Sequence, residues 1–325
     1  MRGRRVLGRA ARSVRNWLGA ERPLILMYHR VADLANDPWS LAVSPDRFAT
    51  HLEILRANRS VVPLSWLVTR LEQGRSARHS VAITFDDAYI DVLDVAKSLL
   101  DCHDCPATVF VPPDFVGSSS GFWWDTLTRI FLATPDLPER LELTTSASTE
   151  TWSVGAQAIL GETARSAVHF EVWSVLKAAT KLERARHLAR VIEWAGVAAD
   201  APASDRCLTE DQVRALSRPG FIDIGGHTMS HPSLPMLSID EQQSEIGRSL
   251  AWIADKLGLD PVGLAYPYGD HDAISIEAAR RAGARFACTT GPSAIRRGAR
   301  LFALPRLQVC NLDAGGFSQL ISDNG

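Results

Sequence analysis

Residues 81–87 read VAITFDD, an apolar and strand-like run that leads directly into Asp86 and Asp87. Similar short runs recur along the chain, separated by segments of helical periodicity; they cover residues 24–28, 107–111, 221–225, 263–266, 285–289 and 306–309. Near-continuous apolar strands that alternate with helices are typical of a parallel sheet covered on both faces. About seven such strands in a chain of this length favour a (β/α) barrel, complete or distorted, over an open doubly wound sheet.

Helix boundaries follow from capping residues. Ser44, which precedes a proline, predicts one helix start, and a second helix is expected to begin near Ser65. Ser238 with Glu241 forms a capping pattern before an apolar stripe, and Gly258 is expected to end that helix. These helices fit between the predicted strands.

One long segment breaks the alternation of strands and helices. Between about Phe115 and Cys207 come a Gly/Ser turn, the aromatic cluster at residues 122–124, a Thr/Ser-rich piece and then helical patterning. We interpret residues 115–207 as a largely helical insertion in a loop of the barrel, and loops of that length usually carry function. The predicted organisation is a basic segment over residues 1–22 and a barrel domain over residues 23–325 that contains the insertion.

Composition limits the class of protein. The chain has 325 residues, of which 46% are hydrophobic, and a formal net charge of -2. No apolar run approaches the roughly 20 residues of a transmembrane helix. The near-neutral charge argues against a general nucleic-acid binder, because such domains are usually strongly basic. Five cysteines without regular spacing favour reduced thiols in a cytoplasmic-type protein.

Positive charge is concentrated near the N-terminus. Residues 1–22 hold seven arginines and one glutamate. Arg9, Arg12 and Arg15 interrupt the apolar core that a secretory signal peptide needs, so we expect no such signal and a cytoplasmic location. Apolar residues recur among the arginines at roughly helical spacing, which would suit a basic amphipathic helix in peripheral contact with an anionic membrane. A solvated segment, or one packed on the body, is the alternative interpretation.

The two adjacent carboxylates form the first candidate site. In a barrel, Asp86 and Asp87 would lie at the C-terminal end of their strand, where active sites collect. Neighbouring like charges raise each other's pKa unless a cation lies beside them. A bound metal ion would ligate one carboxylate and leave the other free as a base. The alternative is that one aspartate caps the following helix.

Two histidines follow another predicted strand. Residues 227–231 read HTMSH and come after Gly225 and Gly226, which we expect to let the backbone turn sharply. His227 and His231 can face one way from a single turn. With one carboxylate they complete a two-histidine, one-carboxylate set, which holds zinc or a similar divalent ion and leaves positions open for water and substrate.

A proline-glycine turn follows a third predicted strand. Residues 265–270 read AYPYGD. Such a tight turn can point a backbone N–H, such as that of Tyr268, at an oxyanion. Taken alone, this pattern would more often be an ordinary turn, and it gains weight from the two motifs before it.

In this order, residues 84–87 (TFDD), 227–231 (HTMSH) and 266–269 (YPYG) resemble the first three motifs of the polysaccharide deacetylase family, carbohydrate esterase family 4. The resemblance spans about residues 24–310. It implies a distorted (β/α) barrel and metal-dependent hydrolysis of an N-acetyl or O-acetyl group on a sugar.

The resemblance also implies roles for individual residues. Asp86 would be the general base, and the Tyr268 N–H would be an oxyanion donor. The metal ligands would be Asp87, His227 and His231.

The chain departs from the family pattern in places. Ala88 stands where a glycine usually follows the two aspartates. The third motif lacks the arginine that often orients the base, and Arg306 could supply that guanidinium instead. The late histidine that provides the acid is absent, because no histidine follows His271. His29 is our leading candidate for the acid, since it follows the first predicted strand and would lie near Asp86; His271 is second, and a structural role for His29 is the alternative.

We therefore predict a carbohydrate deacetylase with a divalent metal, zinc by preference, with cobalt, nickel and iron left open. The expected substrate is an N-acetylated carbohydrate or a lipid-linked sugar, in synthesis of a surface polysaccharide or lipid-linked glycan. A deformylase or deacetylase of a lipid-linked monosaccharide and a non-catalytic glycan-binding module are the alternatives. Trp123, Trp124 and Asp125 could contact a sugar ring or form the insertion's own core. The residues 102–105 (CHDC) could suggest a second metal or redox site, but no other cysteine pair lies near them.

Overall fold

The computed structural model describes residues 22–145, 148–154, 157–217, 221–296 and 298–325. The basic segment predicted over residues 1–22 therefore lies outside the described residues, apart from Arg22. Among the described residues, no helix combines the length and the apolar character that crossing a membrane requires.

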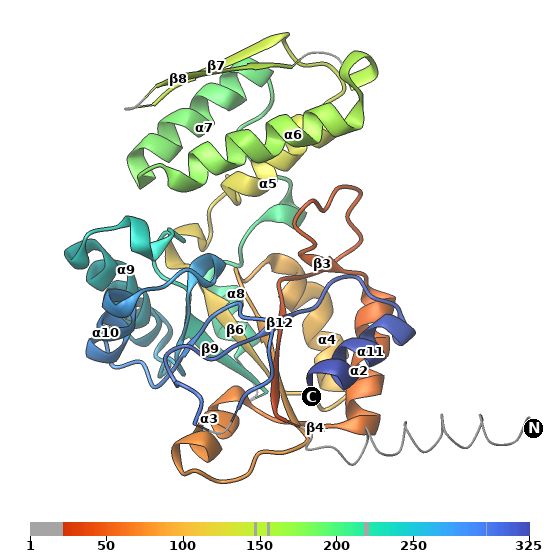
Figure 1. Ribbon diagram of the computed structural model, residues 1–325, viewed down its shortest axis with the longest axis vertical. Coiled ribbons are helices and arrows are strands. Elements are labelled where there is room, and N and C mark those ends of the chain that lie inside the picture. The colour runs from red at the N-terminus through yellow and green to blue at the C-terminus, as the bar shows by residue number, and fades with distance from the viewer. Residues whose placement is uncertain (1–21, 146–147, 155–156, 218–220, 297) are drawn as a thin grey trace, which may run out of the picture.

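A curled parallel sheet forms the centre of the protein, and each of the predicted apolar runs overlaps one of its strands (Figure 1). In order across the sheet these are β11 (Ala287–Cys288), β10 (Leu264–Ala265), β9 (Ile222–Gly226), β6 (Ala107–Val111), β5 (Ser80–Phe85), β1 (Leu24–Tyr28) and β12 (Leu307–Gln308). An eighth strand, β4 (Ser60–Val61), pairs with the start of β5. Beyond the last pairing, Cys288 of β11 bridges to Leu304, just before β12. The predicted distorted (β/α) barrel is confirmed.

Helices surround this sheet. They are α2 (Pro45–Asn58), α3 (Leu64–Glu72), α4 (Lys97–Cys102), α8 (Glu210–Leu216), α9 (Ile239–Trp252), α10 (Ala273–Arg281) and α11 (Ala314–Asn324). The predicted boundaries hold: Ser44 is the N-cap of α2, and Ser238 forms a capping box with Glu241 at the start of α9. Gly258 ends the helical segment that continues α9, in the left-handed conformation that favours glycine.

Strand register brings the candidate residues to one edge of the sheet. Tyr28 of β1 pairs with Phe85 of β5, and the Asp86 N–H donates to the Tyr28 carbonyl oxygen at 3.0 Å. The residues that follow these strands, His29 and Asp86, therefore leave the sheet side by side. The last residue of β9, Gly226, pairs with the end of β6 and with β10 in the same way.

Gly225 and Gly226 do not make the sharp turn that we expected. Both belong to β9, and a Cβ on Gly225 would lie 2.6 Å from the Phe110 ring. A Cβ on Gly226 would lie 2.8 Å from Ser249 Oγ of α9. Glycine is required because neighbouring side chains approach the strand closely. The turn comes later, where Thr228 has a φ of 59°.

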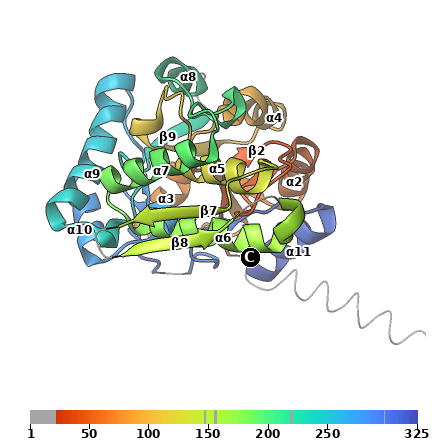
Figure 2. The same cartoon turned by 90° about the horizontal axis from the view of Figure 1, so that it is seen from above.

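The segment between β6 and β9 is largely helical, as expected. It contains α5 (Trp123–Thr128), α6 (Gln157–Ala178) and α7 (Lys181–Ala195). It also contains an antiparallel hairpin of β7 (Arg140–Thr144) and β8 (Thr149–Ser153), which the sequence analysis missed although buried Leu141 and Leu143 alternate with exposed residues. Seen from above, α5, α6 and α7 lie over the middle of the ring of outer helices (Figure 2).

Short elements complete the chain. They are the strands β2 (Arg30–Val31) and β3 (Ala42–Val43), the 3-10 turns at Pro113–Phe115, Ala203–Asp205, Leu234–Met236 and Pro267–Gly269, and the π-helical turns at Val92–Ala96, Arg129–Ala133 and Ile253–Leu257.

Candidate active site

Asp87, His227 and His231 meet at the C-terminal edge of the sheet. Their candidate ligand atoms all lie within 4.8 Å of one another, and all three residues are buried. Asp87 Oδ1 lies 3.6 Å from His227 Nε2 and 3.4 Å from His231 Nε2. The structure thus brings together residues 140 positions apart in the chain.

The chemistry of this set fits a divalent cation. Asp87 Oδ1 is buried and accepts no hydrogen bond from the described residues, which is costly for a carboxylate oxygen. Burial, followed by the neighbouring Asp86, raises the pKa of Asp87 well above its usual value. Burial also lowers the pKa of both histidines. A bound cation would give the buried carboxylate oxygen a partner and favour its ionised form, and it would bind the imidazoles in their neutral form.

Hydrogen bonds fix how the two imidazoles point. His227 Nδ1 lies 2.8 Å from the Ala265 carbonyl oxygen, which selects the tautomer with Nε2 free to bind a metal. The loop that carries His231 is held by Glu245 of α9, whose carboxylate accepts from the backbone N–H groups of Met229 and Ser230 and from the Ser230 hydroxyl. Glu245 was not predicted, because nothing in the α9 sequence marks it as facing this loop.

Strained backbone is concentrated at this site. Positive φ angles occur at Asp87 (69°), Ala88 (53°), His231 (54°) and Tyr268 (59°). Such conformations are costly for residues other than glycine and persist only where the surroundings enforce them. They aim the side chains of Asp87 and His231 into the same space.

Asp86 does not join the triad but pairs with a buried arginine. Arg306 Nη1 and Nη2 lie 2.7 Å from Asp86 Oδ1 and Oδ2, respectively. The guanidinium also donates to Thr84 Oγ1 and to the Thr289 carbonyl oxygen. Burial raises the pKa of Asp86, but Arg306 and the nearby imidazoles outweigh it and hold the pKa at about 2. Asp86 is therefore ionised near neutral pH.

The two candidate acids lie in different surroundings. His29 lines the same cavity as Asp86 and the triad, and its burial lowers its pKa to about 4. His271 stacks on the Tyr266 ring at a centroid separation of 4.9 Å, and its Nδ1 lies 2.9 Å from the Gly269 carbonyl oxygen. His271 is absent from the cavity lining, so only His29 has the position that an acid needs.

The cavity above the triad has a volume of about 280 Å³, and large aromatic side chains form part of its wall. Trp124 of α5, Trp173 of α6 and Trp39 contribute to it, together with Tyr268. Lys177 of α6 lies 4.3 Å above the Tyr268 ring and forms an ion pair with Asp270. The sequence analysis considered Trp124 but missed Trp39, Trp173 and Lys177, which lie on segments without a recognisable motif.

Tyr268 lines this cavity with its backbone in the left-handed conformation. The φ of 59° turns its peptide away from the regular turn, and its N–H has no acceptor among the described residues. Its hydroxyl is also buried without a hydrogen-bond partner in that part of the chain. The N–H is therefore the group that remains available to a ligand.

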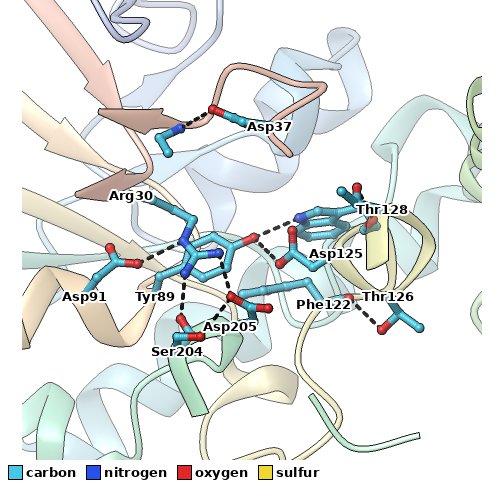
Figure 3. A network of polar contacts seen from close by, with 12 residues as sticks. Arg30, Asp37, Tyr89, Asp91, Phe122, Asp125, Thr126, Thr128, Ser204 and Asp205 are labelled. Carbon is cyan, nitrogen blue, oxygen red and sulfur yellow. Dashed lines mark hydrogen bonds and ion pairs between the residues drawn. The ribbon is translucent and has the colours of Figure 1, made fainter. Parts of the chain in front are cut away.

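A polar network anchors the helical segment to the barrel beside the triad (Figure 3). Tyr89 donates from its hydroxyl to Asp125 of α5 at 2.7 Å and accepts from the Trp124 indole N–H at 2.9 Å. The Arg30 guanidinium lies over the Tyr89 ring and pairs with Asp91 and Asp205. Burial raises the pKa of Asp125 to about 7. Asp125 thus has a structural contact rather than an open position in the cavity.

Fold and site together define a (β/α) barrel with a carboxylate-histidine-histidine set that could hold a metal ion at the C-terminal edge of its sheet. Sequence comparison agrees with this class: the family profile described as "Polysaccharide deacetylase" matches residues 182–287. The Bacillus subtilis protein YxkH, named as a polysaccharide deacetylase, is 31% identical over 102 residues. That alignment covers 31% of this chain and 36% of the relative, so the chain matches about a third of the relative's length.

Solved structures extend the likeness to nearly the whole chain. The Streptococcus pyogenes deacetylase PplD, in complex with acetate, superposes with a TM-score of 0.60 at 18% identity and covers 93% of this chain and 99% of its own. A de-N-acetylase from Aggregatibacter actinomycetemcomitans gives a TM-score of 0.56 at 17% identity, covering 92% of this chain and 100% of its own. At these identities the structures show a shared fold. The profile match and the YxkH relative confirm, over the residues they cover, the resemblance to the polysaccharide deacetylase family that the motifs predicted.

Proposed function

We propose that the protein is a metal-dependent hydrolase that removes an N-acetyl or O-acetyl group from a carbohydrate. The observation that carries this proposal is the juxtaposition of the Asp87, His227 and His231 set with an ionised Asp86 that Arg306 holds in place. The three-residue set can hold a divalent ion while Asp86 stays free to accept a proton, and amide hydrolysis requires both.

The metal ligands would be Asp87, His227 and His231. A divalent ion held there, zinc by preference, lowers the pKa of a bound water towards 7 and polarises a carbonyl oxygen. The donor set does not choose among zinc, cobalt, nickel and iron, because imidazole and carboxylate ligands suit all of them.

Residues of the chain itself would carry out the proton transfers and bind the oxyanion. Asp86 accepts the proton of the attacking water, and Arg306 positions its carboxylate. The free N–H of Tyr268 donates to the oxygen that becomes negative. His29 is neutral near pH 7, so it would receive the proton that Asp86 takes from the water and pass it to the leaving amine.

The half-buried aromatic wall of the cavity supports a sugar substrate. Trp173 offers a flat apolar face on which a pyranose ring can stack, and Lys177 offers a donor for its oxygens. We propose that the helical segment between residues 115 and 207 is an insertion that forms this wall. By family resemblance the substrate belongs to surface polysaccharide or lipid-linked glycan synthesis, and the five free cysteines support a cytoplasmic location.

Acetate release from N-acetylated oligosaccharides and lipid-linked sugars tests this function. Metal-stripped protein, metal-reloaded protein, Asp86→Asn and the exposed control Asp260→Asn are assayed in parallel. We expect release that needs the metal, survives in Asp260→Asn and is lost in Asp86→Asn. Stoichiometric metal binding with formate release instead would favour the deformylase alternative, and glycan binding without any turnover would favour the binding module.

A further inference from the structure

A second cavity lies at the opposite end of the barrel from the candidate active site. It has a volume of about 530 Å³ and is lined by Arg22, Arg75, Arg78 and Arg296, with Leu71 and Ile295 among its apolar residues. We call it the basal pocket. Its lining residues precede strands rather than follow them: Pro23 comes before β1, and residues 74–78 come before β5. Ile295 is held beside Pro23, because its N–H donates to the Pro23 carbonyl oxygen.

The charge of the basal pocket is uncompensated. Its lining contains no aspartate or glutamate, and within the described part of the chain none of the four guanidinium groups makes a hydrogen bond or an ion pair. Like charges around a concave surface concentrate positive potential. Guanidinium groups in such an arrangement favour phosphate, which accepts paired N–H donors.

The surroundings indicate where that phosphate comes from. Leu71 belongs to α3, and the same helix carries Trp66, whose residue surface is 42% exposed, with the Arg70 guanidinium 5.3 Å from its ring. An exposed tryptophan beside arginines is typical of surfaces that contact the interfacial region of a bilayer. Residues 1–21, which lead into Arg22, add six arginines and one glutamate to this end of the chain.

We propose that the basal pocket binds the phosphate of an anionic lipid head group and docks the base of the barrel on a membrane surface. Because the basal pocket and the triad lie at opposite ends of the strands, docking turns the active-site cavity away from the bilayer. The inference concerns a separate surface and does not depend on the proposed function.

Vesicle binding by the full chain tests the proposal. We compare co-sedimentation with phosphatidylglycerol-containing vesicles and with pure phosphatidylcholine vesicles. The variant Arg75→Gln/Arg78→Gln removes two pocket charges, and the matched control Arg186→Gln/Arg248→Gln removes two exposed charges elsewhere. Each arginine near an anionic surface contributes about fivefold to binding, so we expect a loss of roughly thirtyfold in the pocket variant and little change in the control.

Equal binding of both variants to anionic vesicles would overturn the proposal. So would undiminished vesicle binding of the pocket variant combined with a loss of inorganic phosphate binding, because the pocket would then serve a free anion. Circular dichroism checks that both variants are folded, and Arg296→Gln provides a second pocket variant from another loop. Hydrolysis of a soluble substrate should be equal in all of them, which separates this test from that of the proposed function.

Discussion

Arg306 and Asp86 face each other with two parallel contacts of 2.7 Å, one from each terminal guanidinium nitrogen to a different carboxylate oxygen. Both side chains are buried; Asp86 directly follows β5 and Arg306 directly precedes β12, and the two strands are separated in the sheet only by β1. The pair keeps Asp86 ionised and fixes its orientation beside the triad.

Replacing Arg306 with lysine should lower kcat by about 10- to 100-fold with a smaller effect on KM. Lysine keeps the charge but offers a single point of contact, so the carboxylate loses its fixed orientation. Steady-state kinetics on a substrate that the acetate-release assay identifies measures this. An unchanged kcat would contradict a positioning role.

Removing the arginine charge should also destabilise the fold. Arg306→Gln leaves Asp86 buried without its partner, and breaking a buried pair in this way costs about 3–5 kcal/mol. Chemical denaturation measures the free energy of unfolding. The double variant Asp86→Asn/Arg306→Gln should recover much of the loss, and failure to recover would assign the cost to packing rather than charge.

Asp87→Asn and His231→Ala should each abolish stoichiometric metal binding. Each removes one member of a three-ligand set, and metal binding to the native state contributes stability, so a chelator should lower Tm in the parent but not in these variants. Elemental analysis measures the bound metal. His103→Ala, in the CHDC turn, is the control; a loss of metal there would indicate a second site.

His29→Gln should reduce hydrolysis of an N-acetyl sugar by about 10²- to 10⁴-fold, the usual contribution of a general acid. An activated aryl acetate, whose leaving group needs no proton, should be affected much less. His271→Gln is the matched control, because His271 does not line the cavity. An equal loss on both substrates in His29→Gln would refute the acid role.

The pKa of Asp125 gives a dependence of stability on pH. Burial raises this pKa to about 7 in the folded state, above its ordinary value of 3.8. Below the ordinary value the carboxyl is protonated in both states. As the pH rises between the two values, the unfolded state ionises first, so the stability of the folded state falls.

Asp125→Asn should remove this loss. Relative to the parent, the free energy of unfolding of this variant should increase by on the order of 1–3 kcal/mol as the pH is raised from about 5 to about 8. Its Tm relative to the parent should rise over the same pH range. Thermal unfolding of chelator-treated protein measures it, with Asp260→Asn as an exposed control. A difference that does not change with pH would show that Asp125 has no raised pKa.

Glu245→Gln should weaken metal affinity by about 10- to 100-fold without touching a ligand. The glutamate accepts three hydrogen bonds from the loop that carries His231, and groups that orient metal ligands typically contribute this much. Competition with a fluorescent chelator measures the affinity. Glu241→Gln, on the same helix, controls for the loss of charge and should leave metal affinity unchanged.

Much of the architecture could be predicted because it is local. The apolar runs that became β1, β5, β6 and β9 are buried along their whole length or nearly so, and such runs have a recognisable pattern. The residues that follow β5 and β9 could be assigned to one site, since parallel strands end at the same edge of a sheet.

Other features had no such pattern. The hairpin β7–β8 was missed because its polar turn obscured the alternation of Leu141 and Leu143. Gly225 and Gly226 were assigned to a turn. Glycine is needed there because Phe110 and α9 pack too closely against the strand to leave room for a side chain. Neither fact is visible without knowing which elements pack together.

The amino-acid sequence alone shows which residue types stand next to the strands, and therefore the chemistry that this edge of the barrel can offer. Which of these residues meet depends on how the chain folds: Arg306 pairs with Asp86, Glu245 holds the histidine loop, and His29 rather than His271 lines the cavity. Hydrophobic periodicity acts over neighbouring residues and can be read along the chain. The contacts of charged and polar side chains join residues far apart in the chain, 220 positions in the case of Arg306 and Asp86, and their geometry is fixed only when the barrel curls and the helical segment packs over it.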